Sequence, residues 1–423
     1  MRILRVTNVE SFASKNIPKQ SQKNKQIVES ILKKVQKDGD EAIKKYEKKF
    51  TGAKLMSLKV SKNEIEDSYK KISQQEITAI KLAKNRLKKT ESIIKSILKN
   101  KNINNNGIKI SKRFVPLQST GCYIPGGLAN YPSSVIMSVI PAKTAGVKRI
   151  VVVSPPNSNG KIDPLTVVAA DICGADEIYK VGGAQAIAAL SFGTKSIAKV
   201  DKIVGPGGAF VTVAKLLVSD QTAIDMLAGP TELGIIADNS ANAEYVALDI
   251  ISQAEHSRDT FCFVITNSEK LAKSVNQTLR DLIPKIKRSD LVRSSLKQNG
   301  FIAICKNKSD MIKLANELAP EHLQIMTKNP QSVASKITSS GLILMGNETP
   351  SSVSDYILGS NHILPTNGFG KTRGSLSVLD FIKVDTQVTA TRASLAKISK
   401  YLDVFTKAEG LPNHYEAMQG RLK

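Results

Sequence analysis

The spacing of apolar residues changes near Gly121. Before that point apolar residues recur at helical spacing, and the segments Ser61–Glu64 (SKNE) and Ser73–Glu76 (SQQE) both match the capping box that begins a helix. We therefore predict a helical N-terminal region. The polar stretch KNINNNG at 101–107 predicts a loop, and the segment GIKISKRFVPL that follows alternates like a half-exposed strand.

From Gly121 onward, short apolar runs of strand length alternate with helical runs of about a dozen residues, and this pattern occurs twice. Such alternation is typical of a parallel sheet covered by helices. We therefore expect an α/β fold with two Rossmann-like, doubly wound domains. The last forty or so residues carry one helical pattern, which predicts a small C-terminal tail that packs elsewhere. The predicted strands are RIVVVSPP, DEIYKVGG and DKIVGPGG in the first run, and LGIIAD, FCFVIT, FIAIC and GLILMG in the second.

The chain is strongly basic, with 61 Lys and Arg residues against 37 Asp and Glu and a formal charge of +24. Such a balance can indicate a polyanion-binding protein. Here the excess is mostly lysine spread over predicted helices, and few aromatic residues are interleaved for base stacking. We interpret the charge as solvated helix faces and expect no nucleic acid partner. The alternative, a basic nucleic-acid-binding protein, predicts an affinity that falls linearly in log salt.

No apolar run approaches the roughly 20 residues that cross a bilayer, and the N-terminal segment lacks the apolar core of a secretion signal. We therefore expect a cytoplasmic protein that does not bind a membrane. The cysteines are widely separated and form no CxxC pair, so neither a disulfide framework nor a thiolate zinc site is predicted. These cysteines are Cys122, Cys173, Cys262 and Cys305.

The four histidines each lie close in sequence to a carboxylate or carboxamide. A single histidine of this kind is more often structural than functional. Together, and without a thiolate, the set favours a metal site of nitrogen and oxygen ligands, suited to zinc or manganese. Gln253 and His256 lie at positions i and i+3 on one face of a predicted helix. The other pairs are Glu321 with His322, Asp355 with His362, and Glu409 with His414.

Three glycine-rich turns follow predicted strands of the first domain. Backbone amides in such turns can approach a phosphate or nucleotide at the carboxyl edge of a parallel sheet. Each turn could equally be ordinary chain reversal, because no stretch matches GxGxxG with an acidic residue about 20 positions further on. The turns are Gly121–Gly127, Gly182–Gln185 and Gly205–Gly208.

These segments resemble one family. Ala223–His256, with the sequence AIDMLAGPTELGIIADNSANAEYVALDIISQAEH, resembles the signature of histidinol dehydrogenase. The resemblance covers residues 107–416, whereas the Lys-rich first hundred residues match only in helical character. The other blocks occur in the family's order and include GCYIPGG, GGAQAIAAL, VDKIVGPGG, LAPEHLQI, SGLILMG, SDYILGSNHILPT and EGLPNHYEAM.

The resemblance implies an aldehyde dehydrogenase-like fold and a cytoplasmic homodimer with one Zn²⁺ per subunit, for which Mn²⁺ could substitute. It implies the last steps of histidine biosynthesis, in which L-histidinol is oxidised to L-histidine by two NAD through histidinal. The implied metal ligands are Gln253, His256, Asp355 and, from the partner's tail, His414, and the implied catalytic pair is Glu321 and His322. The implied substrate contacts are Thr231, Gln253, His256, His322, Asp355, His362, Glu409 and His414, and the implied cofactor contacts are Tyr123, Gln185 and Gly208.

One position departs from the family: Gly208 stands where an Asn is usual, so the affinity for NAD is the least supported implication. For the chemistry, a histidine near its unperturbed pKa of about 6.5 suits the removal of the hydroxyl proton, and we assign this to His322. Glu321 would activate water for the second oxidation. Cys122 suggests a thiohemiacetal route, but the resemblance gives it no role. A related dehydrogenase of another amino alcohol is the enzymatic alternative.

For the domain organisation we expect an N-terminal arm at 1–20. Residues 21–120 together with 232–375 would form a larger α/β domain whose N-terminal part is helical. Residues 121–231 would form a Rossmann-like domain on the NAD side, and residues 376–423 a tail that packs on the partner subunit.

Overall fold

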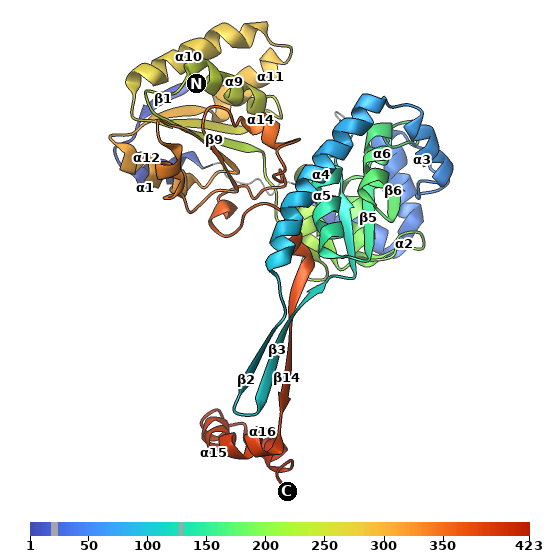
Figure 1. The fold of residues 1–423 in the computed structure, drawn as a ribbon. Coiled ribbons are helices and arrows are strands. Elements are labelled where there is room, and N and C mark those ends of the chain that lie inside the picture. Colours follow the sequence, from blue (N-terminus) through green and yellow to red (C-terminus); the bar gives the residue numbers. More distant parts are fainter. Residues whose placement is uncertain (18–23, 127–129) are drawn as a thin grey trace.

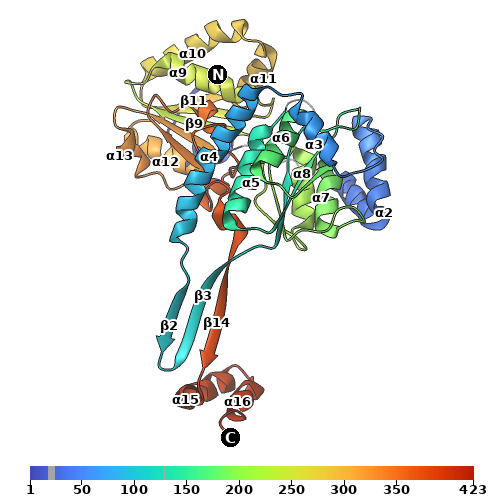
Figure 2. The same cartoon turned by 45° about the vertical axis from the view of Figure 1, so that its right-hand side comes forward.

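The computed structural model describes residues 1–17, 24–126 and 130–423, and it confirms an α/β fold with two parallel sheets (Figure 1). The sheets belong to two bodies that lie side by side. A narrow three-stranded stalk extends away from both bodies and ends in a pair of C-terminal helices (Figures 1 and 2). In the described part of the chain, no helix is both long and apolar enough to cross a membrane.

The first body contains a five-stranded parallel sheet in the order β6-β5-β4-β7-β8. The strand order reverses between β4 and β7, which places a crevice at their carboxyl ends. Most residues of these strands are buried, as expected for a parallel sheet with helices on both faces. The strands are β4 (Ser119–Tyr123), β5 (Arg149–Ser154), β6 (Glu177–Lys180), β7 (Lys202–Val204) and β8 (Ala223–Ile224), and the helices are α5 (Pro132–Ala145), α6 (Pro164–Cys173), α7 (Gly183–Phe192) and α8 (Ala209–Val218).

The N-terminal helices also belong to this body. They are α2 (Lys25–Thr51), α3 (Lys62–Tyr69) and α4 (Gln74–Ile97), and α3 and α4 both begin with the predicted capping box. Their apolar faces pack on α5, α6 and α7, as Ile43 and Leu87 do in the core. The N-terminal helices therefore pack on the domain of residues 121–231, whereas we expected them to pack with residues 232–375. The apolar face of an amphipathic helix does not specify which sheet the helix will cover.

The second body contains a six-stranded parallel sheet in the order β1-β11-β10-β9-β12-β13. Five of its strands, in the order β11-β10-β9-β12-β13, have the same topology as the first sheet, and the strand order reverses between β9 and β12. The expected arm at 1–20 instead contributes the edge strand β1 (Arg2–Arg5), paired with β11, and the helix α1 (Val9–Asn16). The other elements are β9 (Glu232–Ala237), β10 (Phe261–Thr266), β11 (Phe301–Ile304), β12 (His322–Met326), β13 (Leu342–Met345), α9 (Ala243–Ala254), α10 (Glu269–Leu282), η1 (Ile283–Lys285), α11 (Ser289–Asn299), α12 (Lys308–Leu318), α13 (Pro330–Ala334) and α14 (Ser351–Ser354).

The stalk is an antiparallel sheet of β2 (Lys101–Asn105), β3 (Ile108–Pro116) and β14 (Ile382–Ala390). The predicted loop at 101–107 is therefore wrong, because KNINN pairs along β3 although all of its side chains are exposed. The tail also begins later than 376, since η3 (Val378–Phe381) packs in the core of the first body. Beyond the stalk lie α15 (Arg392–Ala408) and α16 (Pro412–Gln419), and a short turn η2 (Phe369–Lys371) precedes η3.

Candidate active site

A pocket of about 310 Å³ lies where the two bodies meet. One wall comes from the turn after β7, which is at the carboxyl edge of the first sheet, together with the loop after β8. The other wall comes from residues at the amino ends of β9 and β12 and from the segments that follow α9 and α14. The lining includes Ser134, Gly205, Pro206, Gly207, Gly208, Asp225, Met226, Thr231, His256, Glu321, His322, Asp355 and His362.

Glu321 lies buried at the amino end of β12. Its Oε2 accepts hydrogen bonds from the Thr231 hydroxyl at 2.7 Å and from the Glu232 amide at 2.8 Å, and its own amide donates to the Glu232 carboxylate at 3.1 Å. Burial raises the pKa of Glu321, and burial together with the neighbouring Glu321 raises the pKa of Glu232 to about 8. The site thus holds two carboxyls that are joined by hydrogen bonds and whose pKa values burial raises.

His322 is the first residue of β12. Its Nε2 lies 3.2 Å from Asp355 Oδ1, and its Nδ1 lies 3.3 Å from the Glu232 carbonyl oxygen and 3.8 Å from Glu321 Oε2. Burial lowers the pKa of His322, but the charges of Glu321 and Asp355 outweigh this and raise the pKa to about 9. The pKa of His322 therefore lies above the expected value of about 6.5 when only these carboxylates, and no cation, surround the ring.

His362 connects the two bodies. Its Nδ1 lies 2.6 Å from the Asp355 carbonyl oxygen, and its Nε2 lies 3.2 Å from Ser134 Oγ, which belongs to α5 of the first body. Burial lowers the pKa of His362. A neutral imidazole shared between the bodies can donate through one nitrogen and accept through the other.

Three of the four residues with a predicted metal role lie together. Gln253 is buried, and its side-chain Nε2 donates to Thr231 Oγ1 at 2.7 Å. This leaves the side-chain oxygen, Oε1, for a ligand. Nδ1 of His256 lies 3.0 Å from the main-chain carbonyl oxygen of Gln253, which leaves Nε2 of the ring for a ligand. Asp355 lines the same pocket, and His322 lowers its pKa against the effect of burial. This donor set of oxygen and nitrogen atoms fits zinc, although no group of three His, Cys, Asp or Glu residues among the described residues is placed to hold a metal.

Glu409 and His414 do not reach this pocket in their own chain. Glu409 follows α15 and His414 lies in α16, and both are exposed. These helices lie at the far end of the stalk (Figures 1 and 2). The pocket is therefore built without either residue.

The candidate cofactor residues divide into two groups. Gly208 lines the pocket as the N-cap of α8, where no side chain caps the helix. Tyr123 and Gln185 are buried outside the pocket lining. The Tyr123 hydroxyl accepts from the Gly183 amide at 3.1 Å, and Gln185 Nε2 donates to Glu47 Oε1 at 2.9 Å. The structure brings these two together at the edge of the first sheet, but both side chains point into the core.

Cys122 is fully buried in β4, and burial raises the pKa of its thiol. A thiol without access to the pocket forms no thiohemiacetal with a substrate, which agrees with the absence of a role for it. The other cysteines, Cys173, Cys262 and Cys305, are buried and free as well.

Sequence reasoning missed Glu232 and Ser134. Glu232 begins an apolar strand and is only 3% exposed, and a carboxylate at that position of a buried strand was the available signal. Ser134 lies among the apolar residues of α5, where nothing in the sequence distinguishes it from a packing residue.

Comparisons with known proteins agree with this architecture. A family model described as histidinol dehydrogenase matches residues 15–422. The histidinol dehydrogenase of Methanococcus maripaludis is 44% identical over 93% of this chain and 92% of its own length, and that of Oceanobacillus iheyensis is 42% identical over 94% of each. The crystal structure of histidinol dehydrogenase from Elizabethkingia anophelis has a TM-score of 0.94 and 33% identity, and covers 100% of this chain and 98% of that chain.

A more distant likeness concerns the fold alone. Betaine aldehyde dehydrogenase from Staphylococcus aureus has a TM-score of 0.50 and 14% identity, over 90% of this chain and 86% of that chain. The two doubly wound sheets of this chain therefore share the fold of an aldehyde dehydrogenase. The matches to histidinol dehydrogenases make the chain an NAD-dependent oxidoreductase of this fold. Within that class, the chain belongs to the histidinol dehydrogenase family.

Proposed function

We propose that this chain oxidises L-histidinol to L-histidine with two NAD, through histidinal, in the pocket between the two bodies. The observation that carries the proposal is the buried Glu321 and His322 pair, which lies beside Asp355 and faces the glycine-rich turn 205–208 across one pocket. We further propose that the enzyme works in the cytoplasm, where NAD and the biosynthetic substrate are present.

In the first oxidation, the alcohol loses a hydride from its carbon to NAD and a proton from its hydroxyl to His322. His322 is suited to this step because Asp355 and the Glu232 carbonyl oxygen fix the orientation of its ring. A cation bound at Asp355 would offset the negative charge that raises the pKa of His322, and this would return the ring toward the neutral form that a base requires.

In the second oxidation, water adds to the aldehyde carbon and the resulting hydrate loses a second hydride to a second NAD. We assign the removal of the water proton to Glu321. The hydrogen bonds from Thr231 and Glu232 hold one oxygen of this carboxylate. No other described residue donates a hydrogen bond to the second oxygen, Oε1, which is the atom that can accept the proton.

The donor set supports a Zn²⁺ site in which Gln253, His256, Asp355 and the partner subunit's His414 are the ligands, with Mn²⁺ as a possible substitute. When bound, the metal would hold the imidazole and amino nitrogens of histidinol and so orient the alcohol. Thr231, His362 and the partner subunit's Glu409 would contact the remaining polar groups of the substrate. Gly208, with Tyr123 and Gln185 after a local rearrangement, would contact NAD.

The C-terminal helices support a homodimer. Their large apolar side chains are exposed on the single chain: Tyr401 is 58%, Val404 66% and Phe405 67% exposed. Val384 and Val388 of β14 are exposed as well. By their spacing, Tyr401, Val404 and Phe405 share one face of α15, and exposed apolar side chains of this kind favour burial against another protein surface. We propose that a second copy of the chain covers it and receives the tail near its own pocket.

The function is tested by measuring NADH formed from a limiting amount of histidinol. We expect two NADH per histidinol, with histidine as the product. One NADH per substrate would refute the four-electron reaction. Oxidation of other amino alcohols at a higher kcat/KM than histidinol would instead favour the alternative dehydrogenase on the same scaffold.

Removal of the metal gives a second prediction. Dialysis against a chelator should abolish the oxidation of histidinol, because the substrate loses the group that orients it, and addition of Zn²⁺ or Mn²⁺ should restore the activity. The metal content is measured alongside activity by atomic emission. Full turnover by protein shown to contain no metal would contradict the proposed template.

A further inference from the structure

A buried ion pair joins Lys215, which lies outside the pocket lining, to Asp225, which lines the pocket. Lys215 of α8 is 2% exposed, and its Nζ forms an ion pair with Asp225, whose side chain is fully buried. The same Nζ donates to the Gly205 carbonyl oxygen at 3.0 Å. A fully buried lysine is rare unless its charge is paired, and here the Asp225 carboxylate supplies the opposite charge.

The pair holds both peptide groups of Gly205. Asp225 Oδ2 accepts from the Gly205 amide at 2.8 Å, while Lys215 donates to the carbonyl oxygen of the same residue. Gly205 has φ +114, and a Cβ there would lie 2.1 Å from the Tyr123 carbonyl oxygen, so only glycine fits. A glycine backbone has more freedom than any other, and these hydrogen bonds remove that freedom at the start of the turn 205–208.

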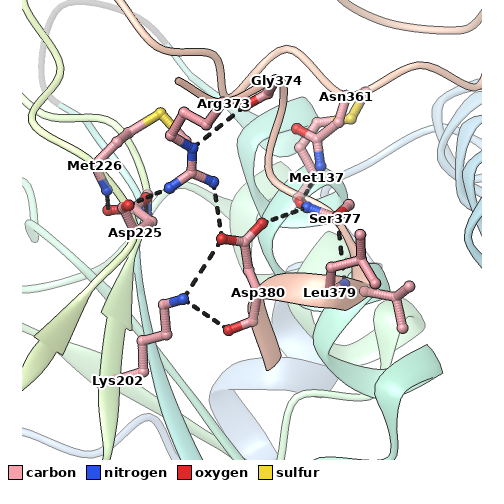
Figure 3. A network of polar contacts seen from close by, with 12 residues as sticks. Met137, Lys202, Asp225, Met226, Asn361, Arg373, Gly374, Ser377, Leu379 and Asp380 are labelled. Atoms are coloured by element: carbon pink, nitrogen blue, oxygen red, sulfur yellow. Dashed lines mark hydrogen bonds and ion pairs between the residues drawn. The ribbon is translucent and has the colours of Figure 1, made fainter. Parts of the chain in front are cut away.

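Asp225 is itself held from the opposite side. Arg373 donates to the Asp225 carbonyl oxygen and forms an ion pair of 2.8 Å with Asp380 (Figure 3). Lys202 donates to the Asp380 carbonyl oxygen at 2.7 Å and completes the network. The Met226 amide also donates to Asp225 Oδ1, at 2.6 Å (Figure 3). The carboxylate of Asp225 therefore has a fixed position from which to hold Gly205.

We infer that Lys215 and Asp225 are positioning residues for NAD, because they fix the turn 205–208 that forms the cofactor side of the pocket. The inference rests on the proposed function. A buried ion pair adds little stability over apolar side chains of the same volume, whereas it does specify one geometry. Although Asp225 also lines the pocket, its carboxylate is taken up by Lys215 and by the Gly205 and Met226 amides. The pair therefore acts through the backbone of Gly205, and so through the residues of the turn that line the pocket.

The test replaces the pair with apolar side chains of similar shape, in the double variant Lys215→Met with Asp225→Leu. Because no unpaired charge remains, the protein should fold. The KM for NAD should rise about tenfold or more, while the KM for histidinol changes by less than about twofold. Hydrogen exchange of the Gly205 amide, measured by mass spectrometry on the peptide that contains it, should become faster.

A matched control removes another ion pair of the same sheet, between Arg149 and Glu177 at 2.8 Å, at the amino ends of β5 and β6 and outside the pocket lining. The double variant Arg149→Met with Glu177→Leu should leave the KM for NAD unchanged. If the first double variant does not fold, the single variant Asp225→Asn tests the same inference. An amide keeps one oxygen for Lys215 but no longer offers a second acceptor to the Gly205 amide, so the KM for NAD should still rise.

The outcomes separate the inference from the function on which it rests. A folded variant with the wild-type KM for NAD and unchanged exchange at Gly205 would overturn the inference alone. Wild-type protein that does not reduce NAD with histidinol would overturn the proposed function. An equal rise of the KM for NAD in the Arg149 and Glu177 control would show a general loss of stability and would also overturn the inference.

Discussion

Glu321→Gln should stop the reaction after its first half. We expect the oxidation of supplied histidinal to fall by about 10² to 10⁴-fold, because the variant has no base for the attacking water. The fold should be retained, because the amide oxygen of Gln can still accept from the Thr231 hydroxyl and the Glu232 amide. Single-turnover measurements with histidinol should still show one NADH per site, since His322 remains to take the hydroxyl proton.

The matched control is Glu317→Gln. Glu317 is a carboxylate of α12 that forms an ion pair with the exposed Lys371, at 3.2 Å, and it lies outside the pocket lining. This variant should oxidise both histidinol and histidinal at the wild-type rate. Near-normal oxidation of histidinal by Glu321→Gln would remove the role that we give to Glu321, and the loss of both half-reactions would indicate a role in binding rather than in water activation.

Two inactive variants should restore activity when they are mixed. His256→Ala removes a ligand from the pocket, and His414→Ala removes the ligand that we expect from the partner's tail, so each homodimer should lack working sites. In a mixed dimer, one site contains both wild-type histidines. Random exchange of subunits should therefore recover about a quarter of the wild-type activity. The measurement is the rate of NADH formation after coexpression of the two chains with different tags.

The control for this experiment is Lys407→Ala, which removes an exposed ion pair with Asp403 in α15 and should remain active alone. Mixed dimers that form but stay inactive would contradict a site shared between subunits. Full activity of His414→Ala alone would show that the tail supplies no ligand.

Much of the fold could be predicted from local pattern. Ser61 and Ser73 cap their helices as the sequence indicates. The seven predicted strands correspond to β5, β6, β7, β9, β10, β11 and β13, whereas the buried strands β4 and β12 were not predicted. The docking of the N-terminal helices could not be predicted, because their apolar faces fit any covered sheet equally well. Strand β2 was missed because its side chains are exposed, and its pairing along β3 comes from backbone hydrogen bonds that side-chain pattern does not report.

The candidate site could be predicted only through residue type and resemblance. His256, Glu321, His322, Asp355 and His362 all line the pocket. His322 begins a strand that the sequence did not predict. Its pKa depends on the preceding Glu321 and on Asp355, which approaches from elsewhere in the chain. Lys215 lies in the apolar helix α8, and a single lysine in such a run usually points to solvent. Its pairing with Asp225 depends on how β8 and α8 pack, which sequence spacing does not encode.

The length of the stalk has a consequence for the cell. One chain carries His256 in its pocket and His414 at the far end of the stalk. An isolated chain would therefore contain both histidines but no complete site, because its own His414 does not reach its own pocket. The number of working sites would then follow the square of the chain concentration whenever dimers are scarce. Histidine output would respond more than proportionally to the amount of enzyme synthesised, and dilution alone would lower the specific activity of a purified sample.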